Sequence, residues 1–146
     1  MDRKQGAYVL CLHVRRPLTL DVGSLGSAFF PAGRYVYVGS ARRGIVARVA
    51  RHRRLAAQKT GKLHWHIDYL LVHPLVQWAG EQFLENGVEC DISKKIEATD
   101  GVTVPAPGFG SSDCRAACRA HLYLLPSGER AKCGFGNLFK TRAFVR

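Results

Sequence analysis

Residues 34–57 read RYVYVGSARRGIVARVARHRRLAA, and the fold depends on the transition inside this stretch. Residues 34–38 are rich in aromatic and β-branched side chains, which favours a strand. The Gly-Ser-Ala tripeptide at residues 39–41 is expected to end that strand. Residues 45–57 then carry apolar side chains at helical spacing, which predicts an amphipathic helix. A strand followed closely by such a helix indicates an α/β domain.

Further strands are predicted on both sides of this unit. We expect strands at residues 7–14, 64–71, 76–83, 121–125 and 138–145, a hairpin from residues 18–22 and 27–30, a short helix at residues 89–98 and a loop at residues 102–110. The length of 146 residues fits one domain. The predicted fold is therefore a single α/β domain over residues 1–146, in which a small mixed β-sheet with an extra N-terminal hairpin is flanked by helices.

The composition is that of an ordinary globular protein, with 47% hydrophobic and 23% charged residues. It argues against a disordered, collagen-like or coiled-coil chain. No apolar run approaches the ~20 residues that a membrane helix requires, and the first residues, MDRKQG, lack the apolar core of a signal peptide. We therefore expect a soluble, cytoplasmic protein without a membrane partner.

The chain is strongly basic, and its charge is unevenly distributed. It contains 22 Lys and Arg against 11 Asp and Glu, a formal net charge of +11, and residues 22–67 contain no acid at all. This balance predicts binding to a polyanion, with nucleic acid first and an anionic membrane surface second. The candidate nucleic-acid contacts are Arg42, Arg43, Arg51, Arg53, Arg54 and Lys59.

Arg48 and His52 are four residues apart on the predicted helix, so one of its faces presents a guanidinium and an imidazole together. The planar guanidinium suits a scissile phosphate because it offers charge and two parallel hydrogen bonds. The alternative is a basic helix face that is merely solvated.

Three polar side chains would share one face of the strand predicted at residues 64–71. His64, His66 and Asp68 alternate along it, so they could bind a metal ion, relay protons or hydrogen-bond a helix terminus. Half-exposed polar side chains on a strand are also commonplace without any such role.

Glu89 lies at the start of the helix predicted at residues 89–98. A carboxylate is favoured there by the helix dipole, so Glu89 could simply be a capping residue. The functional alternative is a ligand for a hard cation, because Mg²⁺ prefers one or two carboxylates together with water and phosphate.

Soft metal ligands are concentrated near the end of the predicted loop. Cys114, Cys118 and His121 have the spacing Cys-x₃-Cys-x₂-His, and Cys90 could be a fourth ligand. Structural Zn²⁺ is possible, but this spacing is not that of a standard zinc finger. We favour buried thiols beside a capped turn.

Several of these segments resemble a known nuclease family. Gly6-Ala7-Tyr8 and Tyr37-Val38-Gly39 resemble the paired tripeptides that name the GIY-YIG nuclease superfamily. More narrowly, GRYVYVGSA, RVARHRR, HWHIDYLL, the Glu-Cys pair and FGSSDC with a following His-Leu resemble the Uri-type endonucleases over residues 6–125. Ala7 departs from the superfamily pattern. The separation of the two tyrosines is longer than usual, which agrees with the predicted hairpin, and no separate DNA-binding module follows.

The resemblance implies a DNA endonuclease that hydrolyses phosphodiester bonds with one Mg²⁺ or Mn²⁺ ion. It places the cation on Glu89 and assigns Arg48 to the charge that builds on the phosphoryl oxygens. Tyr8, Tyr37 or His52 would accept the proton of the attacking water. The resemblance favours Tyr8, whereas the residues alone favour His52, because imidazole titrates near ~6.5 and a free tyrosine near ~10.

Two other functions remain open from the sequence. One is a catalytically idle nucleic-acid-binding module in which Glu89 only caps a helix. The other is a zinc-stabilised interaction domain centred on Cys90, Cys114, Cys118 and His121. Side chains with a possible accessory role in the nuclease are His64, His66, Asp68, Ser112, Asp113, Cys114 and His121.

Overall fold

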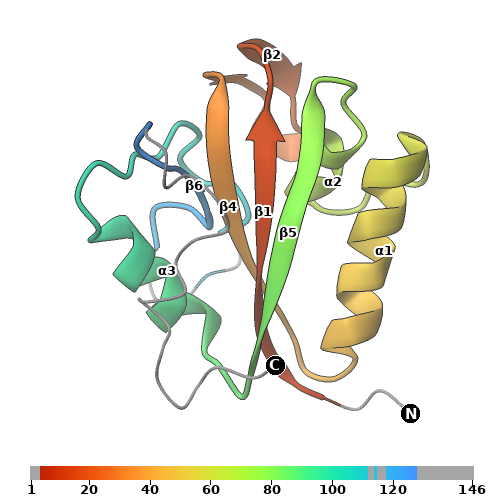
Figure 1. Ribbon diagram of the computed structural model, residues 1–146, viewed down its shortest axis with the longest axis vertical. Helices are drawn as coiled ribbons and strands as arrows, with labels where there is room; N and C mark the ends of the chain where they lie inside the picture. The colour runs from red at the N-terminus through yellow and green to blue at the C-terminus, as the bar shows by residue number, and fades with distance from the viewer. Residues whose placement is uncertain (1–3, 112–113, 115–117, 128–146) are drawn as a thin grey trace.

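Strand β1 (Gly6–Val14) lies inside a four-stranded sheet with the order β5-β1-β4-β6 (Figure 1). Its neighbours β4 (Gly33–Ala41) and β5 (Val76–Glu85) both run antiparallel to it, and β6 (Leu122–Leu124) runs antiparallel to β4. The α/β class and the flanking helices are confirmed. The sequence had suggested a mixed sheet, but every strand pairing in the part of the chain that the structure describes is antiparallel.

The computed structural model describes residues 4–111, 114 and 118–127. The strand expected at residues 138–145 lies outside these ranges. The remaining elements are the hairpin strands β2 (Leu18–Asp21) and β3 (Ser27–Phe30), the short 3-10 turn Gly23–Leu25 between them, and the helices α1 (Ile45–Gln58), α2 (His66–Leu71) and α3 (Glu89–Glu97). The predicted N-terminal hairpin is confirmed, since β2 and β3 pair antiparallel as a separate two-stranded sheet.

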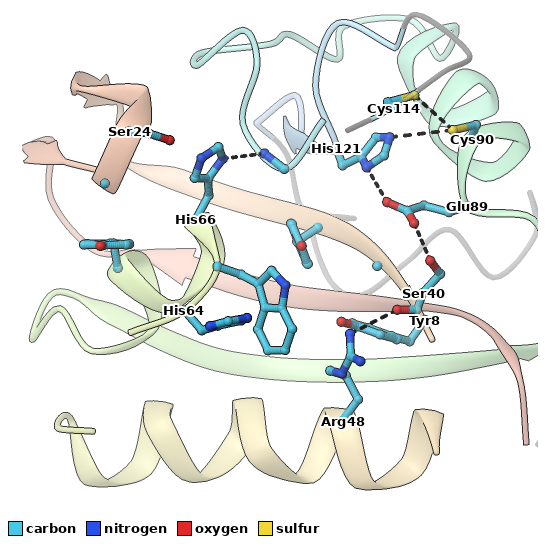
Figure 2. Close-up of a pocket in the computed structure, with 16 residues that line it drawn as sticks. Tyr8, Ser24, Ser40, Arg48, His64, His66, Glu89, Cys90, Cys114 and His121 are labelled. Atoms are coloured by element: carbon cyan, nitrogen blue, oxygen red, sulfur yellow. Dashed lines mark hydrogen bonds and ion pairs between the residues drawn. The ribbon is translucent and has the colours of Figure 1, made fainter. Parts of the chain in front are cut away.

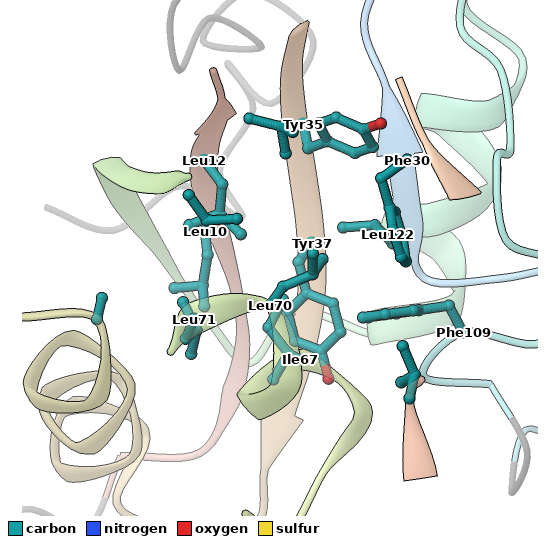
Figure 3. Close-up of a cluster of buried hydrophobic side chains, with 14 of the residues drawn as sticks. Leu10, Leu12, Phe30, Tyr35, Tyr37, Ile67, Leu70, Leu71, Phe109 and Leu122 are labelled. Carbon is teal, nitrogen blue, oxygen red and sulfur yellow. The ribbon is translucent and has the colours of Figure 1, made fainter. Parts of the chain in front are cut away.

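The alternation of side chains along β1 divides the interior into two cores. The even-numbered residues, from Tyr8 to Val14, pack with α1, α2 and the hairpin, while Ala7, Val9 and Cys11 pack with α3 on the opposite face. Figure 3 shows the larger core, in which Tyr35, Tyr37 and Phe109 meet leucines from the sheet and α2. The sheet is therefore covered on both faces, with α1 and α2 on one side and α3 on the other (Figure 1).

The segment at residues 64–71 is a helix, so the strand prediction was wrong there. The buried residues Ile67, Leu70 and Leu71 have the i, i+3, i+4 spacing of a helix face, although the apolar side chains at residues 65, 67, 69 and 71 also alternate as in a strand. The local determinant is Asp68, whose Oδ2 accepts hydrogen bonds from the backbone N–H groups of His64 (2.7 Å) and Trp65 (3.0 Å). A carboxylate in the first turn that satisfies the preceding amides starts a helix.

Strand β4 also continues through residues 39–41, where the sequence predicted a break. Gly39 pairs with Tyr8 in the β1–β4 register. A Cβ atom at Gly39 would lie under 3.0 Å from atoms of the Tyr8 ring, so this glycine makes room for the tyrosine and does not interrupt the strand. The turn comes at Gly44, whose φ of 77° lies in the left-handed region and precedes α1.

Candidate active site

A pocket of about 640 Å³ opens beside the sheet, and residues from distant parts of the chain line it (Figure 2). Four of the five predicted catalytic residues are among them: Tyr8 on β1, Tyr37 on β4, Arg48 on α1 and Glu89 at the start of α3. These four side chains line one concave surface. His52, the fifth, lies behind the pocket wall and is only 1% exposed.

Tyr8 connects the pocket to His52. Its hydroxyl lies 2.9 Å from His52 Nε2, and the two rings pack at a tilt of 48°. Burial raises the pKa of Tyr8 well above its usual value, although the nearby Arg48 guanidinium acts in the opposite direction. Burial also lowers the pKa of His52, so its imidazole is neutral at neutral pH. A neutral histidine beside a protonated tyrosine is a hydrogen-bonded pair through which a proton can move.

Asp68 lies beneath this pair and is fully buried. It accepts a two-pronged ion pair from Arg51, at 3.1 and 3.0 Å, and its Oδ1 lies 3.7 Å from His52 Nδ1. Burial alone would raise the pKa of this carboxyl, but the nearby His52 imidazole and the hydrogen bonds from Arg51 and the backbone outweigh burial and hold the pKa well below its usual range. Asp68 is therefore a buried anion that supports the site from behind.

Arg48 is held at the pocket by Ser40 and Trp65. Its Nη1 donates to the backbone oxygen of Ser40 at 3.3 Å, and its guanidinium carbon lies 4.5 Å from the centre of the Trp65 ring. Arg51 approaches the same indole at 4.9 Å. Trp65 lines the pocket but was not predicted as a site residue; the only sequence signal was its position between the two histidines of the 64–71 segment.

Glu89 makes a contact through each of its carboxylate oxygens (Figure 2). The Ser40 hydroxyl donates to Oε1 at 2.5 Å, and Oε2 forms an ion pair with His121 Nδ1. The contact with Glu89 raises the pKa of His121 even though burial acts to lower it. Ser40 was missed by sequence reasoning, and its place directly after the Tyr-Val-Gly tripeptide was the signal that could have found it.

Next to Glu89, four side chains form a cluster that could hold a metal ion. Cys90, Cys114, Cys118 and His121 each offer one ligand atom, and these atoms all lie within 4.8 Å of one another. Cys90 Sγ is 3.2 Å from Cys114 Sγ and 4.0 Å from His121 Nε2. Three sulfurs and one imidazole nitrogen form a donor set typical of zinc and not of magnesium.

Of the other predicted accessory residues, two lie at the pocket and two lie outside the described part of the chain. His64 and His66 line the pocket, and His66 Nδ1 accepts the backbone N–H of Gly110 at 2.9 Å, which attaches the loop before β6 to α2. Gly110 has a φ of 72° and packs closely on Tyr37. Ser112 and Asp113 lie outside the residues that the structure describes.

Three of the six predicted nucleic-acid contacts are engaged within the protein. Arg51 is paired with Asp68, and Arg53 pairs with Glu81 at 2.6 Å. Lys59 Nζ donates to three backbone oxygens, those of Leu71 (3.0 Å), His73 (2.9 Å) and Val76 (2.6 Å). These contacts give the three cations structural roles that a basic sequence run does not reveal.

The other three, Arg42, Arg43 and Arg54, are exposed, and we call them the exposed arginine trio. Within residues 4–111, 114 and 118–127 their side chains take part in no hydrogen bond or ion pair. Their charges are therefore available to a partner from solution.

The family described as "Domain of unknown function DUF123" matches residues 7–143. The chain belongs to this family. The matched region of this DUF123 protein contains every residue that lines the pocket and all four members of the cysteine–histidine cluster. No curated protein and no solved structure matches the chain. Among the described residues of this DUF123 chain, no helix has the length and apolar character needed to cross a bilayer.

Proposed function

We propose that this protein is a GIY-YIG-type endonuclease of the Uri kind, which hydrolyses phosphodiester bonds of DNA with one Mg²⁺ or Mn²⁺ ion. The observation that carries this proposal is the meeting of Tyr8, Arg48 and Glu89 around one pocket. A proton acceptor, a guanidinium and a carboxylate are the three kinds of group that metal-assisted phosphodiester hydrolysis needs.

The divalent cation would be held by Glu89. Its carboxylate faces the pocket with 23% of its side chain exposed, and each oxygen has lone pairs beyond those used by Ser40 and His121. One carboxylate completed by water and a substrate phosphate suits Mg²⁺. When bound, the ion supplies charge that stabilises the leaving oxyanion.

Tyr8 and His52 would share the work of the general base. Burial disfavours a free-standing Tyr8 phenolate, so the tyrosine acts best as a relay. It accepts a proton from the attacking water while its own hydroxyl proton passes to His52 Nε2 over 2.9 Å. The imidazolium that results faces the Asp68 carboxylate, which stabilises it. Tyr8 would thus contact the water, and His52 would hold the proton.

Arg48 would bind the non-bridging phosphate oxygens. The Trp65 ring and the Ser40 backbone oxygen restrain its guanidinium at the pocket, so little reorganisation is needed when charge develops. The exposed arginine trio would contact phosphates on either side of the cut. These contacts carry no base information, so we expect binding with little sequence preference.

The deciding experiment incubates the purified protein with Mn²⁺ and a panel of duplex, flapped, nicked and single-stranded DNAs. We expect metal-dependent cleavage of at least one substrate, and loss of cleavage in Tyr8→Phe with unchanged DNA affinity. Tyr35→Phe is the matched control, because it removes a hydroxyl that bonds Pro31 O (2.6 Å) on the same sheet outside the pocket. Absence of cleavage on the whole panel, with DNA binding retained, would favour the idle binding module instead.

A further inference from the structure

We propose that Cys90, Cys114, Cys118 and His121 bind one Zn²⁺ ion in a tetrahedral structural site whose histidine is oriented by Glu89. This site adjoins the proposed catalytic centre but does not take part in cleavage. It reverses the preference for uncoordinated thiols that the sequence spacing alone had suggested.

The four donor atoms lie at separations that suit a tetrahedral zinc ion. Zinc binds sulfur at about 2.3 Å and imidazole nitrogen at about 2.0–2.1 Å, so tetrahedral ligands are separated by about 3.5–3.8 Å. The four donor atoms lie within 4.8 Å of one another, and two of the separations are 3.2 and 4.0 Å. An ion at their centre would need shifts of only a few tenths of an ångström to about 1 Å, which side-chain rotation supplies.

The chemical nature of the four ligands also favours zinc. Three thiols and one imidazole are a common structural zinc set, and hard cations such as Mg²⁺ select oxygen ligands instead. Four protein ligands leave no open coordination position, which separates a structural zinc site from a catalytic one. The half-buried position of the three cysteines also limits access of water to the centre.

His121 is oriented as a zinc ligand would be. Its Nε2 faces Cys90, while its Nδ1 contacts the Glu89 carboxylate. A histidine that binds zinc through one ring nitrogen almost always donates its other N–H to a carboxylate or carbonyl. The His121 side chain is only 3% exposed, so its Nδ1–H needs a partner within the protein, and the Glu89 carboxylate is that partner. Glu89 therefore fits the outer carboxylate of a carboxylate–histidine–zinc arrangement.

The position of the cluster explains what the ion would do. Cys90 lies in the first turn of α3, and His121 directly precedes β6. Between them in the sequence are Cys114, which lines the pocket, and Cys118. One ion would connect α3, these two cysteines and the edge of the sheet, and would hold Glu89 at the pocket through His121.

The test measures metal binding without DNA, so its outcome is independent of the proposed nuclease activity. The full-length protein is stripped of metal under reducing conditions and titrated with Co²⁺. We expect intense visible absorption typical of tetrahedral cobalt together with sulfur-to-cobalt charge transfer, saturating at about one ion per chain and displaced by Zn²⁺. A weak spectrum without charge transfer would overturn the proposal, whatever metal the protein contains as purified.

Variants locate the site. Cys118→Ser should abolish the charge-transfer band or reduce it by about a third, since one of three thiolates is lost, whereas Cys11→Ala, at the described cysteine outside the cluster, should bind Co²⁺ as the wild type does. Glu89→Gln should weaken zinc binding about 10–100-fold in competition with a chelator. Unchanged zinc affinity in Glu89→Gln would refute the orienting role of Glu89. Should Cys118→Ser fail to fold, the wild-type cobalt spectrum still decides.

Discussion

Replacing Glu89 by Gln separates catalysis, binding and folding at one position. The substitution keeps the size of the side chain and one oxygen that can accept from Ser40, but it removes the charge that faces the pocket and His121. Gln is a poor ligand for a hard cation. We expect the cleavage rate to fall by at least about 10²–10³-fold, the range observed when one group that stabilises developing charge is lost.

The effects on binding and stability should be much smaller. Loss of one negative charge near the phosphate leaves DNA affinity unchanged or slightly higher. Loss of the favourable position at the start of α3 should cost about 0.3–1 kcal/mol of unfolding free energy. Asp91→Asn is the matched control, because Asp91 is an exposed acid in the same first turn and loses the same dipole interaction.

The assay combines single-turnover cleavage in Mn²⁺, DNA affinity by fluorescence anisotropy and urea unfolding, for the wild type and both variants. Saturating zinc is present throughout, so that a weakened zinc site does not imitate a catalytic defect. If Glu89→Gln cleaves at the wild-type rate and differs from Asp91→Asn in nothing, Glu89 is only a helix-dipole partner and the proposed metal role is refuted.

Three further predictions concern Gly39, Asp68 and the exposed arginine trio. Gly39→Ala should displace the Tyr8 ring by about 1 Å, which should lower the cleavage rate by about 100-fold and the free energy of unfolding by about 1–3 kcal/mol. Cleavage kinetics and urea unfolding measure these effects, and a wild-type cleavage rate would contradict the close contact between Gly39 and Tyr8. Because the pKa of Asp68 is lowered in the folded protein, its charge stabilises the fold fully above the unfolded-state pKa near ~3.9 and less as the pH falls below that value. The free energy of unfolding should therefore fall less steeply with acid in Asp68→Asn than in the wild type. Parallel curves of unfolding free energy against pH would count against this. Replacing the exposed arginine trio by Ala should weaken binding to all DNA sequences alike and leave the stability close to that of the wild type. The slope of the logarithm of the binding constant against the logarithm of the salt concentration should become shallower by up to about 2.7. An unchanged slope would mean that these three arginines do not contact the phosphates.

The strands of the central sheet could be predicted because their determinants are local. Residues 7–14 are almost wholly apolar and lie on an inner strand, with a core on each face. Gly39, by contrast, has a non-local determinant. Its effect on the chain depends on the ring of Tyr8, which is opposite it on another strand, and no pattern within residues 34–41 contains that information.

The candidate site also has features that the sequence could predict and features that it could not. The resemblance of the two tripeptides and the following helices to a nuclease family selected Tyr8, Arg48 and Glu89, and the fold brings these three side chains to one pocket. Sequence could not show which cations find acidic partners, because the partner of Arg51 is 17 residues away and the partner of Arg53 is 28 residues away. The error at residues 64–71 has the same origin, since the buried Asp68 that begins α2 is stabilised by a side chain on another helix.

The spread of the pocket along the chain also bears on when it can exist during synthesis. The residues that line the pocket extend from Tyr8 to His121. Strand β1 can complete its hydrogen bonds only after β5 has been synthesised. More than four-fifths of the 146 residues are therefore synthesised before His121, the last residue that lines the pocket, is present. Long-range pairing of this kind is slow compared with helix formation. The basic stretch at residues 22–67 is therefore synthesised well before the pocket is assembled, and the early encounters of the nascent chain with polyanions would be electrostatic only.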